Sequence, residues 1–172
     1  MTNLAPINII SLIMIIIIND IIFIANQPAG ASGATDWPML GGEKMPTVLI
    51  IDDAAFMRAA LKQTLTQYGY CVIGEACDGK DGVNQYLRKQ PDIVMMDLAM
   101  PEMDGLTALR EIKKIDSNAK VIMCSSVKQT AMVVEAVRAG ASDFITKPVE
   151  SVRLIAAIKR ITGTAFCNAG YQ

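Results

Sequence analysis

Five short apolar runs, each followed by a stretch of helical spacing, constrain the fold of this chain more than any other feature of its sequence. The runs are Val48–Ile51, Cys71–Ala76, Ile93–Met96, Val121–Cys124 and Asp143–Thr146. The stretches predicted to be helical are residues 56–68, Asp78–Lys89, 104–112, Thr130–Ala139 and Val149–Ile161. Alternating strands and helices form a parallel sheet with helices on both faces, and continuously apolar strands fit burial on both faces. The sequence therefore predicts an α/β, doubly wound domain.

The first 44 residues differ from this pattern. Leu4–Ala25 is an isoleucine-rich run that is long enough to span a bilayer. Gln27–Gly42 is rich in Pro, Gly, Ala and Ser, which predicts a flexible linker over residues 27–44. No Lys or Arg precedes Lys44, so the charged flank expected of a signal peptide or an oriented anchor is missing. Three interpretations of the apolar run stay open: a membrane anchor, an upstream stretch added by a wrongly chosen start, or a buried accessory helix.

These patterns divide the chain into four expected segments. They are an apolar segment over residues 1–26, the linker over 27–44, a folded domain over 45–163 and a C-terminal tail over 164–172. Met45-Pro46-Thr47 immediately precedes the first strand, which is a natural place for a domain to begin. The tail is too short for an output domain, so we expect the folded domain to act alone.

Composition removes several classes of function. The chain contains no histidine, which excludes histidine-based zinc sites and catalytic triads. Its net charge of −1 gives no electrostatic basis for binding nucleic acid. The four cysteines show no CxxC spacing and lie mostly in apolar runs, which favours free thiols in a reducing compartment. They are Cys71, Cys77, Cys124 and Cys167.

Polar side chains stand where four of the predicted strands end. Asp52 and Asp53 follow the first strand, Asp97 follows the third, Ser125 the fourth and Lys147 the fifth. In an open parallel sheet, ligands bind at the carboxyl ends of the strands, near the point where strand order reverses. We therefore expect three carboxylates, a hydroxyl and an ammonium group to converge at one edge of the sheet.

This set of groups suits phosphoryl transfer to a carboxylate. Clustered carboxylates repel one another strongly unless a cation joins them, and an all-oxygen site suits Mg²⁺. A carboxylate can attack phosphorus to give an aspartyl phosphate. The transfer requires neutralisation of the charge on the phosphoryl oxygens. Mg²⁺, Lys147 and the Ser125 hydroxyl would supply that neutralisation.

Each residue also has a purely structural interpretation. An Asp-Asp pair such as Asp52–Asp53 often caps a helix or lies in a solvated turn, and Asp97 can simply end its strand. Ser125 can cap the next helix, and Lys147 with its proline is an ordinary loop dipeptide. Phe144 is a core residue by default. Their order at successive strand ends favours a functional site over these separate interpretations.

Residues 46 to about 163 resemble a CheY-like receiver domain of two-component response regulators. The motifs that carry the resemblance are VLIIDDAAFMR (48–58), DIVMMDLAMPEMDG (92–105), VIMCSSVKQ (121–129) and AGASDFITKP (139–148). The first and third look especially like the single-domain chemotaxis regulators. The resemblance implies a flavodoxin-like, five-stranded parallel sheet with strand order 2-1-3-4-5. Residues 1–44 have no counterpart in it.

The resemblance also implies a metal site. Asp97 matches the phosphoacceptor, which also ligates the metal, and Asp53 matches the acidic residue that ligates Mg²⁺ directly. Asp52 matches its neighbour, which acts through water, and Ala99 matches the residue that offers a backbone carbonyl to the metal.

Three further positions match the parts of the family that respond to phosphorylation. Ser125 and Lys147 match the hydroxyl and lysine that contact the phosphoryl group, and the bond from Lys147 to Pro148 is commonly cis in the family. Phe144 matches the aromatic switch residue, with Ser125 as its partner in switching. Because Phe144 lacks a phenol hydroxyl, only its packing can report the state of the switch.

The expected function is a signalling switch and not an enzyme, although receivers catalyse their own phosphorylation and dephosphorylation. A sensor histidine kinase would donate the phosphoryl group. A downstream protein, with the flagellar motor switch as one candidate, would bind the face formed by Thr130–Ala139, Asp143–Thr146 and Val149–Ile161. The expected location is the cytoplasm, at the inner face of the membrane if Leu4–Ala25 is an anchor.

The sequence alone leaves three rival functions open. A membrane-tethered receiver would use Leu4–Ala25 to stay near a receptor or motor. A Mg²⁺-dependent aspartyl-phosphate hydrolase would turn over substrate, but the sequence shows no insertion that would form a cap domain. A receiver cut from a DNA-binding regulator would need a further domain after the tail.

Overall fold

The computed structural model describes residues 39–40, 43–126 and 130–163, and the chain divides into two units, Met1–Lys44 and Met45–Gln172. In the first unit, β1 (Met39–Leu40) and β2 (Glu43–Lys44) form an antiparallel pair inside the predicted linker. The apolar run and the C-terminal tail lie outside the described residues, so the predictions for them stay predictions. Among the described helices, none is both long and apolar enough to cross a bilayer.

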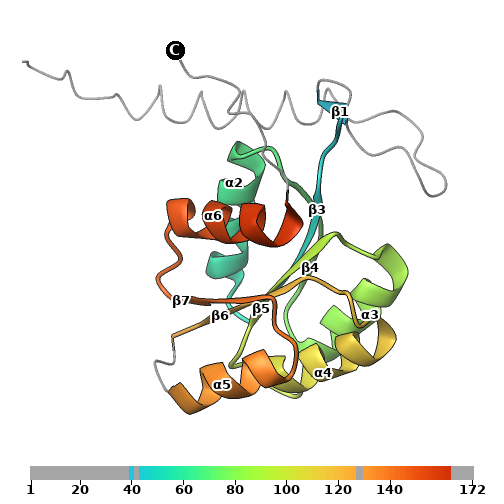
Figure 1. Ribbon diagram of the computed structural model, residues 1–172, viewed down its shortest axis with the longest axis vertical. Coiled ribbons are helices and arrows are strands. Elements are labelled where there is room, and N and C mark those ends of the chain that lie inside the picture. Colours follow the sequence, from blue (N-terminus) through green and yellow to red (C-terminus); the bar gives the residue numbers. More distant parts are fainter. Residues whose placement is uncertain (1–38, 41–42, 127–129, 164–172) are drawn as a thin grey trace, which may run out of the picture. The chain divides into compact units, whose positions relative to one another are not determined.

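A five-stranded parallel sheet forms the centre of the second unit (Figure 1). Its strands are β3 (Thr47–Ile51), β4 (Cys71–Ala76), β5 (Ile93–Asp97), β6 (Val121–Ser125) and β7 (Asp143–Thr146). They pair in the order β4-β3-β5-β6-β7, which in chain order is the predicted 2-1-3-4-5. The direction of winding reverses between β3 and β5, so the carboxyl ends of these two strands flank the place where such sheets bind ligands.

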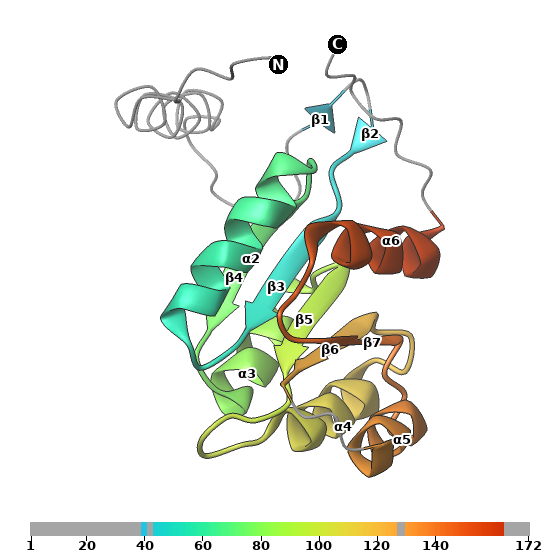
Figure 2. The same ribbon diagram turned by 90° about the vertical axis from the view of Figure 1, so that its left-hand side faces the viewer.

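Helices cover both faces of the sheet (Figure 2). One face carries α2 (Ala55–Gln67) and α6 (Ser151–Thr162). The other carries α3 (Gly79–Lys89), α4 (Gly105–Ile115) and α5 (Thr130–Arg138). Each of the four connections between successive strands of the sheet is the helical crossover that parallel pairing requires, and the predicted α/β, doubly wound architecture is confirmed.

The side chains of the central strands divide between two hydrophobic cores. In β3, Leu49 and Ile51 pack in the core below α3 and α4, whereas Val48 and Ile50 pack in the core below α2 and α6. All four side chains are fully buried. Burial on both faces explains why these strands are continuously apolar instead of alternating with polar residues. It also holds their carboxyl ends rigidly in place.

Some element boundaries differ from the predicted ones. The last helix begins at Ser151 and not at Val149, because Glu150 has an extended backbone (φ −80°, ψ 131°) and precedes the first helical turn. β5 extends one residue further than predicted and includes Asp97. The Asp97 side chain is therefore held by the sheet itself and not by the loop that follows.

We predict that residues 1–44 are dispensable for folding and phosphoryl chemistry. Both cores and every strand of the five-stranded sheet lie within Met45–Gln172. A protein that begins at Met45 should melt in one cooperative transition and should accept phosphoryl groups as the full chain does. Calorimetry and intact-mass measurements check both expectations. An unfolded or inert truncated protein would show that the segment belongs to the domain.

Candidate functional site

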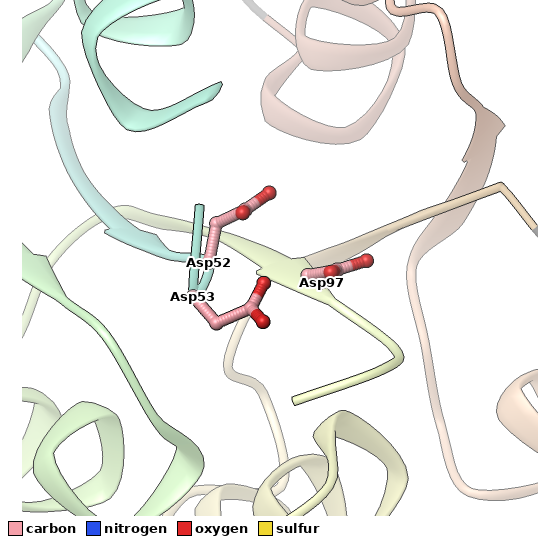
Figure 3. A group of neighbouring side chains, drawn as sticks. All are labelled: Asp52, Asp53 and Asp97. Carbon is pink, nitrogen blue, oxygen red and sulfur yellow. The ribbon is translucent and has the colours of Figure 1, made fainter. Parts of the chain in front are cut away.

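Three carboxylates meet at the carboxyl ends of β3 and β5 (Figure 3). Asp52 and Asp53 directly follow β3, and Asp97 is the last residue of β5. One oxygen atom from each carboxylate lies within 4.8 Å of the other two. Asp52 and Asp97 are 1% and 6% exposed, whereas Asp53 is exposed to solvent. Two buried acidic groups and one open one thus form a single cluster, as the sequence predicts.

Lys147 reaches this cluster from β7, the edge strand, which lies two strands away from β5. It follows β7, and its Nζ lies 2.8 Å from Oδ2 of Asp52 and 3.1 Å from Oδ2 of Asp97. Its backbone N–H donates to the Ser125 carbonyl at 2.8 Å, which fixes it beside the end of β6. The Lys147–Pro148 bond is cis, as the resemblance implies. The ammonium group is therefore the shared partner of the two buried carboxylates.

The three carboxylates differ in the partners they already have. Oδ1 of Asp52 accepts from the Ala54 N–H at 2.9 Å, and its Oδ2 accepts from Lys147. Oδ1 of Asp97 accepts from the Leu98 N–H at 2.8 Å. Among the described residues, the Asp53 carboxylate has no hydrogen-bond or ion-pair partner, and it faces solvent. Asp53 is thus the carboxylate most open to a new ligand.

Burial sets the protonation behaviour of the cluster. Burial raises the pKa of Asp97 above its usual value, and the hydrogen bond and charge of Lys147 offset only part of that rise. Burial works to lower the pKa of Lys147, but its hydrogen bonds to Asp52 and Asp97 outweigh burial and raise the pKa. Lys147 therefore stays charged at neutral pH, and burial makes a negative charge on Asp97 energetically costly.

The remaining predicted residues lie on β6, on β7 and in the loop after β5. Ser125 is fully buried at the end of β6, where it pairs with Thr146 of β7 in the sheet register. Phe144 lies on β7 two residues before Thr146, and it is partly buried against the core below α3 and α4. Ala99 is exposed in the loop that follows Asp97. The roles that the resemblance implies for these three residues stay predictions.

The donor set fits Mg²⁺. The cluster contains three carboxylates and one ammonium group, which pairs with two of them, so the cluster holds more negative than positive charge. Carboxylate oxygens at the end of a rigid sheet, with one of them open to solvent, suit a small hard cation that keeps several of its waters. Asp53 and Asp97 offer oxygens at the open side, and the Ala99 carbonyl lies two residues beyond Asp97 in the chain.

One residue at this site was missed from the sequence. Nη1 of Arg58, in the first turns of α2, donates to the carbonyl of Asp52 at 2.8 Å and to that of Asp53 at 3.1 Å. Its Nε lies 3.7 Å from Glu75, which also pairs with Lys62 at 2.9 Å. Its spacing, five residues after the acidic pair, places Arg58 one helical turn into the following helix, but does not reveal that its side chain returns to the turn.

Comparison with known proteins identifies the family. The model of the response regulator receiver domain matches residues 48–159. The chain is 53% identical over 115 residues to a chemotaxis protein CheY of Thermotoga maritima, covering 67% of this chain and 96% of that protein. It is 50% identical over 113 residues to a chemotaxis protein CheY of Bacillus subtilis, covering 66% of this chain and 94% of that protein.

A solved structure agrees with these sequence matches. The crystal structure of the CheX-CheY-BeF3-Mg complex from Borrelia burgdorferi contains a chain that superposes with a TM-score of 0.68 at 35% identity. The match covers 70% of this chain and 91% of that one. Together with the sheet order and the acidic cluster, these matches show that the chain belongs to the response regulator receiver family and is a CheY-like signalling domain of the kind that accepts a phosphoryl group.

Proposed function

We propose that Asp97 is the phosphoacceptor of this receiver and that Mg²⁺ binds beside it. Asp53 and Asp97 ligate the metal directly, Asp52 acts through water, and the Ala99 backbone carbonyl adds one further oxygen. The observation that carries the proposal is the cluster itself, three carboxylate oxygens within 4.8 Å of one another beside one ammonium group. The Borrelia burgdorferi relative, named as a complex with BeF3 and Mg, supports it.

The chain's residues divide the work of the transfer. A carboxylate oxygen of Asp97 attacks phosphorus, the bond from phosphorus to the donor's leaving group breaks, and the leaving group departs with the electron pair. Lys147 lies 3.1 Å from the attacking carboxylate and neutralises charge on the phosphoryl oxygens. Ser125 donates a hydrogen bond to one of them. Bound Mg²⁺ supplies further neutralisation of the same oxygens.

We predict that phosphoryl uptake requires a divalent cation. Without it, the incoming anionic group would enter a cluster that already carries excess negative charge. Incubation with a small acyl phosphate and Mg²⁺ should add one phosphoryl group by intact mass. The same incubation with a chelator should add none. Uptake that proceeds equally in the chelator would contradict the metal site.

The signal leaves the site through Ser125 and Phe144 in this proposal. A phosphoryl group on Asp97 carries a charge near −1.5 to −2, and Ser125 moves toward it to donate a hydrogen bond. The space vacated at the end of β6 admits the ring of Phe144 from the neighbouring strand, because an inward ring gains contacts and loses exposure. That motion reshapes the face of α5, β7 and α6, where the downstream partner binds.

Replacing Ser125 by Ala should uncouple the switch from the chemistry. We expect Ser125→Ala to be phosphorylated still, while the population of the switched state falls by about tenfold, a coupling of about 1–2 kcal/mol. Amide chemical shifts of β7 and α6, with and without phosphoryl donor, measure that population. Ser126→Ala, at the exposed neighbouring serine, is the matched control and should behave as the parent protein. Undiminished shift changes in Ser125→Ala would exclude this route.

The partners and location follow from the same proposal. A sensor histidine kinase is the phosphoryl donor, and a downstream protein such as a flagellar motor switch component binds the α5, β7 and α6 face. Self-catalysed phosphorylation and dephosphorylation at Asp97 serve switching and not turnover of a substrate. The protein works in the cytoplasm, and residues 4–25 would tether it to the inner membrane face if they form an anchor.

A further inference from the structure

We propose that Arg58 is a positioning residue that holds the turn bearing the two metal-binding carboxylates, Asp52 and Asp53. This inference rests on the proposed Mg²⁺ site. It assigns part of the metal affinity to a side chain that touches neither the metal nor the phosphoryl group. The contact that carries it is one guanidinium nitrogen, Nη1, which donates to the carbonyls of Asp52 and Asp53 at 2.8 and 3.1 Å.

The geometry of this contact is specific to the turn. In an extended strand, successive carbonyl groups point to opposite sides, so one donor cannot reach two of them. Here the carbonyls of Asp52 and Asp53 converge on Nη1 because the chain turns directly after β3. Holding both carbonyls therefore fixes the backbone dihedral angles between them. Those angles decide whether the Asp53 carboxylate points toward Asp97 or into solvent.

The turn has few other constraints at Asp53. The Asp52 side chain is buried and fixed by Ala54 and Lys147, but the Asp53 side chain is exposed and forms no hydrogen bond or ion pair with a described residue. Ala54, at the N-cap of α2, lacks a capping side chain. Arg58 does not cap the helix, but it ties α2 to the turn in a different way, because its Nη1 donates to the carbonyls of Asp52 and Asp53.

Arg58 is itself oriented from the neighbouring strand. Its side chain is 19% exposed, and Nε lies 3.7 Å from Oε2 of Glu75 on β4. Lys62, one turn further along α2, pairs with the other oxygen of Glu75 at 2.9 Å. Arg58 and Lys62 thus lie on the same helix, pair with the same acidic residue and carry the same positive charge, but of the two only Arg58 contacts the turn. This makes Lys62 a matched control for the loss of charge.

The test measures Mg²⁺ affinity directly, by calorimetric titration of the unphosphorylated protein with MgCl₂. We expect Arg58→Met to weaken Mg²⁺ binding by about tenfold, in the range typical of residues that orient metal ligands. Lys62→Met should change the Mg²⁺ affinity by less than about twofold, because the Lys62 charge is exposed to solvent and therefore well screened. Equal losses in the two variants would show that charge alone matters and would overturn the inference, as would unchanged affinity in Arg58→Met.

Two further measurements separate positioning from general stability. Melting in the absence of Mg²⁺ shows that each variant is folded at the temperature of the titration. If Arg58→Met does not fold, Arg58→Lys takes its place, since it keeps the charge but lacks the planar group. We expect about threefold weaker binding in that variant, and unchanged affinity would overturn the inference. A parent protein that binds no Mg²⁺ would instead disprove the proposed metal site itself.

Discussion

Replacing Asp97 by Asn is expected to abolish phosphoryl uptake, the largest functional effect of any single change in this protein. The amide oxygen of Asn is neutral and does not attack phosphorus to give a stable acyl phosphate, whereas the carboxylate does. The variant should stay folded, because burial already opposes the negative charge at this position, as the raised pKa of Asp97 shows. Incubation with a small acyl phosphate and Mg²⁺, followed by intact mass, measures the loss.

Asp116→Asn is the control for this change. Asp116 lies at the other end of α4 and accepts a hydrogen bond from the Tyr86 hydroxyl, which an amide oxygen can also accept. We expect it to take one phosphoryl group as the parent does. Labelling that persists in Asp97→Asn would assign the phosphoryl group to another residue and reject the proposal.

The largest loss of stability is expected from Gly105→Ala. Gly105 is the first residue of α4, and its N–H donates to the Leu98 carbonyl at 3.0 Å, which closes the loop after β5. A Cβ atom at this position would lie 1.9 Å from the backbone oxygen of Asp97. Because that obstacle is the backbone of a buried strand, relief requires the end of β5 or the start of α4 to shift. We expect a loss of about 3 kcal/mol in the free energy of unfolding.

A second glycine serves as the matched control. Gly69 has a positive φ of 80°, and a Cβ there would meet no atom within 4 Å. Gly69→Ala therefore costs only the strain of the left-handed backbone, about 1 kcal/mol. It should leave phosphoryl uptake unchanged, whereas Gly105→Ala should also slow uptake because it displaces Asp97. Denaturant unfolding gives both free energies, and equal stability of Gly105→Ala and the parent would refute the packing argument.

The acidic cluster illustrates how much of the site can be predicted from a linear pattern. Asp52, Asp53, Asp97 and Lys147 each follow an apolar run, and parallel pairing necessarily brings such positions to one edge. The pattern did not distinguish their environments. Asp53 is open while Asp52 is 1% exposed, and this difference depends on how the turn after β3 is folded.

Arg58 and Gly105 show what a linear pattern leaves out. Arg58 reads as a polar residue on an amphipathic helix, and nothing in its spacing reveals that its guanidinium returns to two carbonyls of the preceding turn. From the sequence, Gly105 is only a residue near the start of a helix. A glycine is needed there because a Cβ atom would collide with the Asp97 carbonyl, which belongs to a different element. Both roles arise from contacts between segments, which sequence periodicity does not encode.

The sequence by itself determined the α/β class, the strand order implied by its motifs, and the set of groups at the carboxyl edge of the sheet. The class and the set of groups follow from hydrophobic periodicity and from the rules of parallel connection, which act on residues close in the chain. The strand order follows from the resemblance of its motifs to the receiver family. Only the tertiary structure decided which carboxylate is open to a ligand and which are paired, and where Lys147 is placed between them. Those outcomes depend on burial and on distances of a few ångströms between residues as far apart as Asp52 and Lys147, and they are fixed only when both cores are packed.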